Sequence, residues 1–228
     1  MDDVARPRPD LSVASRPGVS PRGSTEFDRL ANFNDAIYAI SLTLQVVGLE
    51  APKITHAEST RELWDALGDD SSQILMFFVS FAVIGSFWLA HHRFYRKLAA
   101  IDRSLLAVSL AYLAFISFLP FPSSLLGDEA RNSLAVALYA LCIAAVAGLE
   151  VVMQWIARNH DLFLEPPSAV AYRWGLIASL TPVVIFLVSI PIAFVSPSLA
   201  ILTWILNIPV GAILGRRIPA EARAYYDR

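Results

Sequence analysis

The stretch RLANFNDAIYAISLTLQVVGLE, from Arg29 to Glu50, is long enough and apolar enough to cross a bilayer as a helix. It nevertheless carries polar and ionisable side chains, namely Asn34, Asp35, Tyr38, Ser41, Thr43 and Gln45. Such groups are costly in hydrocarbon and are expected to face protein or a water-filled path. The stretch is therefore predicted to be a membrane helix that meets lipid on at most part of its surface.

The polar and apolar residues of this helix separate when successive residues are placed about 100° apart. One face then holds Asp35, Tyr38, Leu42 and Gln45. The opposite face is an apolar stripe of Phe33, Ala36, Ile40, Leu44 and Val47, with Thr43 at its flank. Two interpretations follow: the stripe faces lipid, or it faces an axis shared with other copies of the chain and forms a hydrophobic constriction there.

The whole composition is that of a membrane protein. The chain is 56% hydrophobic and 17% charged, with a mean hydropathy of +0.53, whereas soluble domains carry about 25% charge. We expect an all-α polytopic fold with six transmembrane helices, over residues 30–49, 73–90, 105–119, 134–156, 176–195 and 199–214. Pro120 and Pro122 should stop or kink the third helix, and Ser196-Pro197-Ser198 should join the last two as an antiparallel hairpin.

The distribution of positive charge predicts the orientation. All but Lys53, Arg61 and Arg131 of the 18 Lys and Arg residues fall on one side of the expected spans, so both termini are expected in the cytoplasm and the protein in the plasma membrane. The connections on the other side are acidic, which would concentrate cations there. We expect a disordered cytoplasmic tail over residues 1–28, a six-helix domain over 29–217 and a cytoplasmic C-terminal tail over 218–228.

Several kinds of chemistry have no support in the sequence. No phosphate-binding glycine loop or catalytic motif is present, the net charge of −2 argues against a nucleic-acid partner, and Cys142 stands alone. His91 and His92 are adjacent and point about 100° apart on a helix, so a shared metal is disfavoured. We therefore expect no enzyme, no cofactor and no bound metal beyond a permeant ion. Glu150 is either a proton or cation site within the membrane or an interfacial carboxylate paired with a basic residue.

The motif Arg29-x-x-x-Phe33-Asn34-Asp35 resembles the RxxxFSD signature that begins the first membrane helix in the transmembrane-protein-175 family of potassium channels. Further similar segments follow in the same order up to residue 127; they are LW at 63–64, IGSFWLAHH at 84–92, DRSLL at 102–106 and FLPFPSSLLG at 118–127. A single six-helix unit is similar to the bacterial branch of this family, whose members are homotetramers. Asn34 departs from the Ser of the signature, which affects packing behind the first helix.

The resemblance implies a pore lined by the first helix of each of four subunits. The family's apolar constriction lies seven residues after the motif Phe, which here is Ile40, and the next layers facing the pore would be Thr43 and Val47. His91, at the end of the second span, is expected to reach Asp35. The partners implied are other copies of the chain, the lipid bilayer and potassium ions.

From the residues and the resemblance together, we expect a passive potassium-permeable channel. A ring of Ile40 side chains would select by the cost of dehydrating the ion, because no cage of carbonyl oxygens replaces the lost water. The alternative is a proton-coupled secondary transporter that uses Asp35 or Glu150 as its protonatable site.

Overall fold

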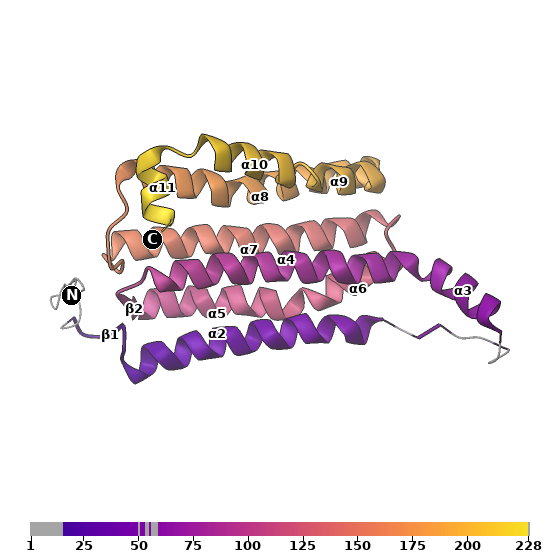
Figure 1. Cartoon of the computed structure of the whole chain (residues 1–228), viewed down its shortest axis with the longest axis horizontal. Helices are drawn as coiled ribbons and strands as arrows, with labels where there is room; N and C mark the ends of the chain where they lie inside the picture. The colour runs from indigo at the N-terminus through magenta and orange to yellow at the C-terminus, as the bar shows by residue number, and fades with distance from the viewer. Residues whose placement is uncertain (1–15, 50, 53–54, 56–58, 228) are drawn as a thin grey trace, which may run out of the picture.

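Long helices that run side by side make up most of the chain in a computed structural model, which describes residues 16–49, 51–52, 55 and 59–227 (Figure 1). The helices are α2 (Thr25–Leu44) with the 3₁₀ turn η1 (Gln45–Gly48), α3 (Thr60–Asp69), α4 (Ser71–Arg96), α5 (Arg103–Phe118), α6 (Pro120–Asp128), α7 (Ser133–Asn159), α8 (Ala169–Val195), α9 (Pro197–Trp204), α10 (Asn207–Arg217) and α11 (Ala220–Tyr226). Two short strands, β1 (Val19–Pro21) and β2 (Ala100–Asp102), pair antiparallel with Ser20 opposite Ile101. The expected all-helical architecture is thus confirmed, with one small ribbon added.

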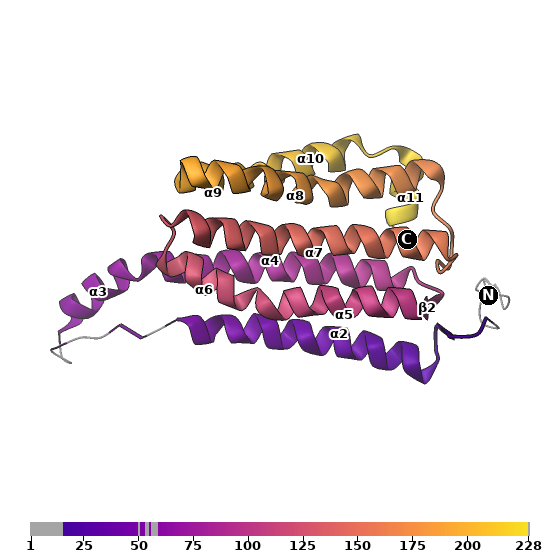
Figure 2. The same ribbon diagram turned by 180° about the vertical axis from the view of Figure 1, so that it is seen from behind.

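The helices form layers, with α2 at one edge and α8, α9 and α10 at the other (Figures 1 and 2). Between them lie α4 and α5–α6, and then α7, which contacts α5, α6 and α8. Helix α7 is the central element because its small side chains let neighbours approach closely on several sides. Its fully buried small residues are Ala135, Ala140, Ala147 and Ala157.

Five segments are long and apolar enough to cross a membrane: 71–96, 103–128, 133–159, 169–195 and 197–217. The expected first span is helical as well, but it is not among the five. The reason lies in its sequence, since the 20 residues of α2 include Glu26, Asp28, Arg29 and Asp35. A multi-pass membrane protein is therefore supported, with five clear spans and one helix of mixed character.

Prolines determine where several helices end. Helix α5 stops at Phe118 and α6 begins at Pro120, which confirms the expected break in the third span. The predicted hairpin is also present: Ser196 ends α8, its side chain accepts from Leu199 N at 3.3 Å, and Pro197 begins α9. At these first positions proline loses no helical hydrogen bond, since its missing N–H would have no partner.

The last expected span differs from a single helix. Helix α9 ends at Trp204 and α10 starts at Asn207, because Pro209 has no N–H to donate to the carbonyl of Ile205 and is accommodated in a first helical turn. The two pieces together still count as one membrane-length segment.

Parts of both expected tails have secondary structure. Residues 1–15 of the expected N-terminal tail lie outside the described residues, but residues 16–28 are ordered as β1 and the first turn of α2. Ser24 explains where α2 starts, since its hydroxyl accepts from Phe27 N at 3.3 Å as an N-cap. At the other end, most of the expected tail is helix α11, which packs on α8.

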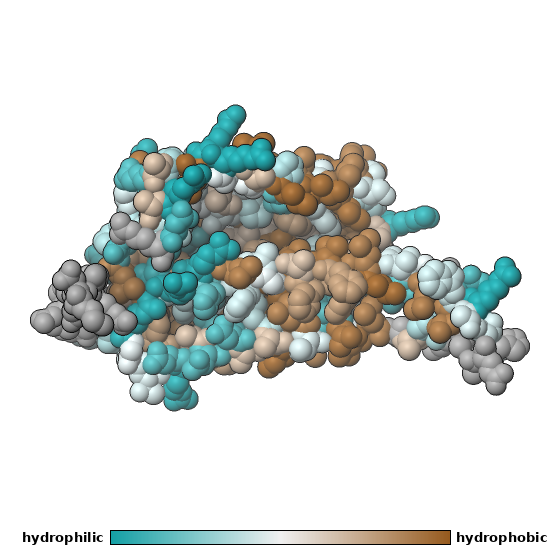
Figure 3. Space-filling view, viewed as in Figure 1, coloured by the Kyte–Doolittle hydropathy of each residue, from teal (hydrophilic) through white to brown (hydrophobic). Residues whose placement is uncertain are grey.

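Surface character changes along the molecule. In Figure 3, hydrophobic residues cover much of the bundle toward α6 and α9, whereas hydrophilic residues gather near β1 and α11 and on α3. Elements from near both ends of the chain therefore lie at one polar end of the bundle (Figure 1).

Candidate functional site on the first long helix

Helix α2 has one buried face and one exposed face. The buried face repeats every three or four residues and consists of Phe27, Leu30, Asn34, Tyr38, Ser41 and, in η1, Gln45. It packs against α4 and α5. The buried face is rotated slightly about the helix axis from the polar face that was expected to be buried. Asn34 and Ser41 point inward, while Asp35 is exposed.

The exposed face is the apolar stripe that the sequence indicated. Ile40 is 53% exposed and Val47 is 74% exposed, and Phe33 and Leu44 are nearly half exposed. Thr43 lies on the same face, and its hydroxyl donates within the helix, to Ala39 O at 3.0 Å and Ile40 O at 2.9 Å. The hydroxyl oxygen still presents acceptor lone pairs outward. A stripe of this kind has to be covered by lipid or by another protein surface.

Asn34 and His91 are brought together behind this stripe. Asn34 Nδ2 lies 3.1 Å from His91 Nε2, and both side chains are buried. His91 therefore pairs with Asn34 and not with Asp35, the residue that was expected to be its partner. Adjacent residues on a helix point about 100° apart, so Asn34 and Asp35 meet different residues of α4.

Asp35 bonds to a different residue of α4. Its carboxylate accepts from Trp88 Nε1 at 2.9 Å, which fixes a charged group near the exposed face of α2. The Trp88 ring in turn lies 5.5 Å from the His92 ring, centroid to centroid. Asn34 and Asp35 thus connect α2 to α4 through two separate contacts, one buried and one at the surface of the subunit.

Aromatic side chains complete the packing around His91. Its ring stacks on Tyr112 at 4.9 Å and lies 4.5 Å from Tyr95, centroid to centroid. The Tyr38 and Tyr112 hydroxyls are 2.5 Å apart, and Tyr95 bonds to Ser109 at 2.8 Å. These contacts join α2, α4 and α5 and hold the exposed stripe of α2 in a fixed orientation. Sequence reasoning missed Tyr95 and Tyr112, for which spacing within one helix gives no signal.

The remaining motif residues do not join this network. Arg29 and Phe33 are both exposed on α2, away from His91. Glu150 makes no hydrogen bond to these residues among the described contacts; it is buried on α7 and borders a cavity that α2 does not line. Within the described ranges, no three His, Cys, Asp or Glu side chains are placed to hold a metal ion.

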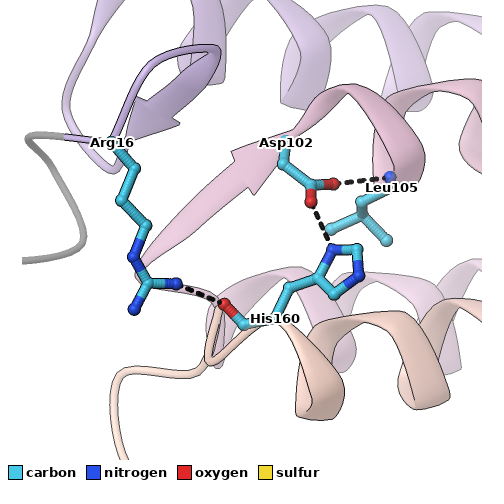
Figure 4. A network of polar contacts seen from close by, with 4 residues as sticks. All are labelled: Arg16, Asp102, Leu105 and His160. Atoms are coloured by element: carbon cyan, nitrogen blue, oxygen red, sulfur yellow. Dashed lines mark hydrogen bonds and ion pairs between the residues drawn. The ribbon is translucent and has the colours of Figure 1, made fainter.

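A second set of contacts fixes the chain just before α2. Arg22 donates to Arg96 O at 2.6 Å and to Leu98 O at 3.1 Å, beside the pairing of β1 with β2. Figure 4 shows the neighbouring contacts, in which Arg16 donates to His160 O at 3.2 Å and His160 Nδ1 lies 2.5 Å from Asp102.

The Asp102 carboxylate also accepts from Leu105 N at 2.8 Å and so caps the start of α5. The loops that follow α4 and α7 are therefore tied to the segment that leads into α2. The one local signal for this connection in the sequence is Ser24, which can cap a helix that starts before Arg29.

Comparison with known proteins gives consistent similarities. A family model described as endosomal/lysosomal potassium channel TMEM175 matches residues 29–120. A potassium channel of Streptomyces collinus is 31% identical over 65% of this chain and 74% of its own length. The human endosomal/lysosomal proton channel TMEM175 is 23% identical, and the match covers 72% of this chain but only 34% of the human protein.

Solved structures show the same fold. A TMEM175 homologue from Chamaesiphon minutus, described as a lysosomal potassium-selective channel homologue, superposes with a TM-score of 0.69 over 86% of this chain and all of that chain, at 24% identity. A variant of the potassium channel MtTMEM175, in complex with a nanobody fusion, gives a TM-score of 0.60 over 88% of this chain and 97% of that chain, at 20% identity.

Proposed function

Because the chain belongs to the TMEM175 family of potassium channels, we propose that it is a passive potassium channel in which four copies of α2 surround one pore. The observation that carries the proposal is the exposed apolar stripe of α2, which lies opposite a face buried against α4 and α5. A helix held so firmly on one side, and so apolar on the other, suits the wall of a shared pore.

Ile40, Thr43 and Val47 are the proposed layers of the pore. They recur at intervals of three and four residues, Ile40 and Thr43 on the exposed face of α2 and Val47 in the turn η1 that follows it, so four copies would present three stacked rings. An ion crossing the Ile40 ring would lose part of its hydration shell without gaining backbone oxygens. Potassium loses water more readily than sodium, so the ring should favour potassium moderately.

The proposed membrane arrangement has six crossings. Helix α2 would be the sixth, because its charges are concentrated at Glu26, Asp28 and Arg29 near one end, and Asp35 is bonded to Trp88. An even number of crossings is consistent with β1 and α11 lying at one end of the bundle. The excess of basic residues at that end supports cytoplasmic termini in the plasma membrane.

Substitution of Ile40 tests the constriction. In liposomes containing purified protein, Ile40→Asn should raise the single-channel conductance and lower the preference for potassium over sodium. Val188→Asn on α8 is a matched control, because Val188 is also 53% exposed but lies on a different helix. An Ile40→Asn variant with unchanged conductance and permeability ratio would exclude a constriction at this position.

The same flux assay separates a channel from a proton-coupled carrier. Of the two carboxylates that a carrier could use, Asp35 and Glu150, the variant tests Glu150, which is buried within α7 and borders a cavity. A carrier's potassium flux should saturate and should collapse in Glu150→Gln. A channel should let potassium run down its gradient in that variant without a coupled proton.

A further inference from the structure

A cavity of about 440 Å³ lies between α4, α7, α8, α10 and α11, away from α2. Along α8 it extends from Tyr172 to Pro182, which is about 15 Å of helix. It therefore reaches from the polar end of the bundle into the membrane-spanning part. Most of its lining is apolar or aromatic and includes Phe94, Trp174, Pro182 and Leu214.

Two cations stand at the polar end of this cavity. Arg93 and Lys97 lie one turn apart at the end of α4 and both line the cavity. Arg93 donates through Nε to Leu89 O at 3.1 Å, which leaves its two terminal amino groups available to an anion. Lys97 Nζ donates to Tyr225 O at 2.8 Å and has two further N–H groups.

Aromatic rings shape the space around Lys97. Its Nζ lies 3.9 Å from the centroid of the Tyr225 ring and 4.3 Å from that of Tyr226. The Tyr225 hydroxyl is buried and has no hydrogen-bond partner among the described residues. The mouth of the cavity thus combines two cations with one unsatisfied hydroxyl, a set that suits an oxyanion.

The deeper polar groups have less need of a ligand. Gln154 Nε2 donates to Ser179 at 2.9 Å, and Asn207 Nδ2 donates to Trp204 O at 3.0 Å. Glu150 is negatively charged when ionised and faces the positive charge of Arg93. A ligand's negative group is therefore expected at Arg93 and Lys97, and the part that extends past Glu150 must be uncharged.

We propose that this cavity binds an anionic phospholipid of the cytoplasmic leaflet. The phosphate lies among Arg93, Lys97 and the Tyr225 hydroxyl, and one acyl chain runs along α8 over Trp174 and Pro182. A cavity of this size holds a headgroup or a chain but not a whole phospholipid, so the rest of the molecule stays in the bilayer. Basic pockets between membrane helices on the cytoplasmic side are suited to such headgroups.

Native mass spectrometry of the purified full-length protein tests the charges. Phosphatidylglycerol should bind with clear preference over phosphatidylcholine of the same chain length. Replacing both cations, as Arg93→Gln with Lys97→Gln, should weaken phosphatidylglycerol binding by about tenfold or more, since each cation contributes roughly fivefold. The matched control, Arg216→Gln with Arg217→Gln, removes two exposed cations outside the cavity and should change binding less than twofold.

A second pair of variants tests the cavity with the charges intact. A Cβ at Gly211 would meet open space, so Gly211→Trp should fill the cavity and abolish the preference for phosphatidylglycerol. Ile213→Trp lies on the same helix but not in the cavity lining, and should bind as the wild type does. Glycerol 3-phosphate should not displace the lipid, because it lacks the chain.

The proposal is overturned if phosphatidylcholine binds equally well, if the control cations matter as much as Arg93 and Lys97, or if Gly211→Trp retains the lipid. Displacement by glycerol 3-phosphate would overturn it too, by showing a site for soluble phosphate. Ion flux plays no part in these measurements, so their failure would leave the proposed channel function untouched.

Discussion

At the scale of single residues, Asn34 and His91 show that a small rotation of a helix about its axis changes which side chain is buried. The motif made Asp35 the expected partner of His91, yet the adjacent Asn34 points into the bundle and is only 2% exposed. This placement is favourable because a neutral amide costs less to bury than a carboxylate does. The Asp35 carboxylate stays at the surface of the subunit, where Trp88 donates to it.

A double-mutant cycle should detect this pairing. Asn34→Ala leaves His91 Nε2 buried without its partner and should cost about 1–3 kcal/mol of unfolding free energy in detergent. In the His91→Phe background the same change should cost much less. Asp35 bonds to Trp88 and not to His91, so the changes in unfolding free energy caused by Asp35→Asn and His91→Phe should add. If the changes caused by Asn34→Ala and His91→Phe also add strictly, the contact between Asn34 and His91 is contradicted.

Lys97 should make the free energy of unfolding depend on pH in the alkaline range. Burial, together with the nearby positive charges of Arg93 and Arg96, lowers the pKa of Lys97 to about 8, against 10.5 for the ordinary side chain, even though Asp227 and Glu165 act in the opposite direction. The unfolded chain therefore binds this proton more tightly, and the free energy of unfolding should rise as the pH increases from about 8 to 10.5.

Comparison with Lys97→Met isolates this contribution from other titrating groups. The difference in unfolding midpoint between wild type and variant should shift in favour of the wild type over that pH range. A difference that stays constant from pH 7 to 10.5 would show that Lys97 is not the group responsible.

At the scale of helices, one of the contacts that hold α11 to the bundle depends on a glycine. The Tyr226 hydroxyl donates to Ala171 O at 3.0 Å and passes over Gly175, where an added methyl group would overlap it. Gly175 therefore allows α11 to cover the end of α8 where the cavity opens.

Gly175→Ala should displace the Tyr226 hydroxyl and loosen α11, although the contacts of Lys97 with Tyr225 and Tyr226 remain. We expect faster proteolysis after the arginine of that helix, Arg223, with little change in the helices of the bundle. Gly215→Ala is the control, since a Cβ there meets open space. Equal cleavage of the two variants would show that the approach of Tyr226 to Gly175 does not hold α11.

At the scale of the whole molecule, the exposed stripe of α2 is the surface that the proposed tetramer would cover. Helix α8, at the opposite edge, is also richly apolar outside, with Val184, Leu187 and Val188 about half exposed. In the proposed tetramer these two surfaces have different neighbours, sister subunits for α2 and lipid for α8.

Cysteine cross-linking should tell the two surfaces apart. In a Cys142→Ala background, Ile40→Cys should form disulfide-linked dimers readily on oxidation, because the proposed ring brings several copies together. Val188→Cys should form few. The detergent-solubilised particle should have four times the 25.0 kDa mass of one chain; a monomeric particle, or equal cross-linking at both positions, would contradict the assembly.

The sequence by itself determined the class of protein, the position of most helices and the exposed stripe of α2. Hydrophobic length and proline act locally, so the breaks at Leu119 and Ser196 followed directly from neighbouring residues. The family followed from ordered motifs, and its identification is confirmed by the comparisons.

The tertiary structure alone decided which side chains meet. The pairing of Asn34 with His91, the ribbon of β1 and β2, the docking of α11 and the cavity beside Arg93 all join segments far apart in the chain. Each depends on how a helix is rotated about its axis and how deeply it packs. A shift of one residue turns a side chain by about 100°, and the pattern within a single helix fixes its buried face only to about that precision.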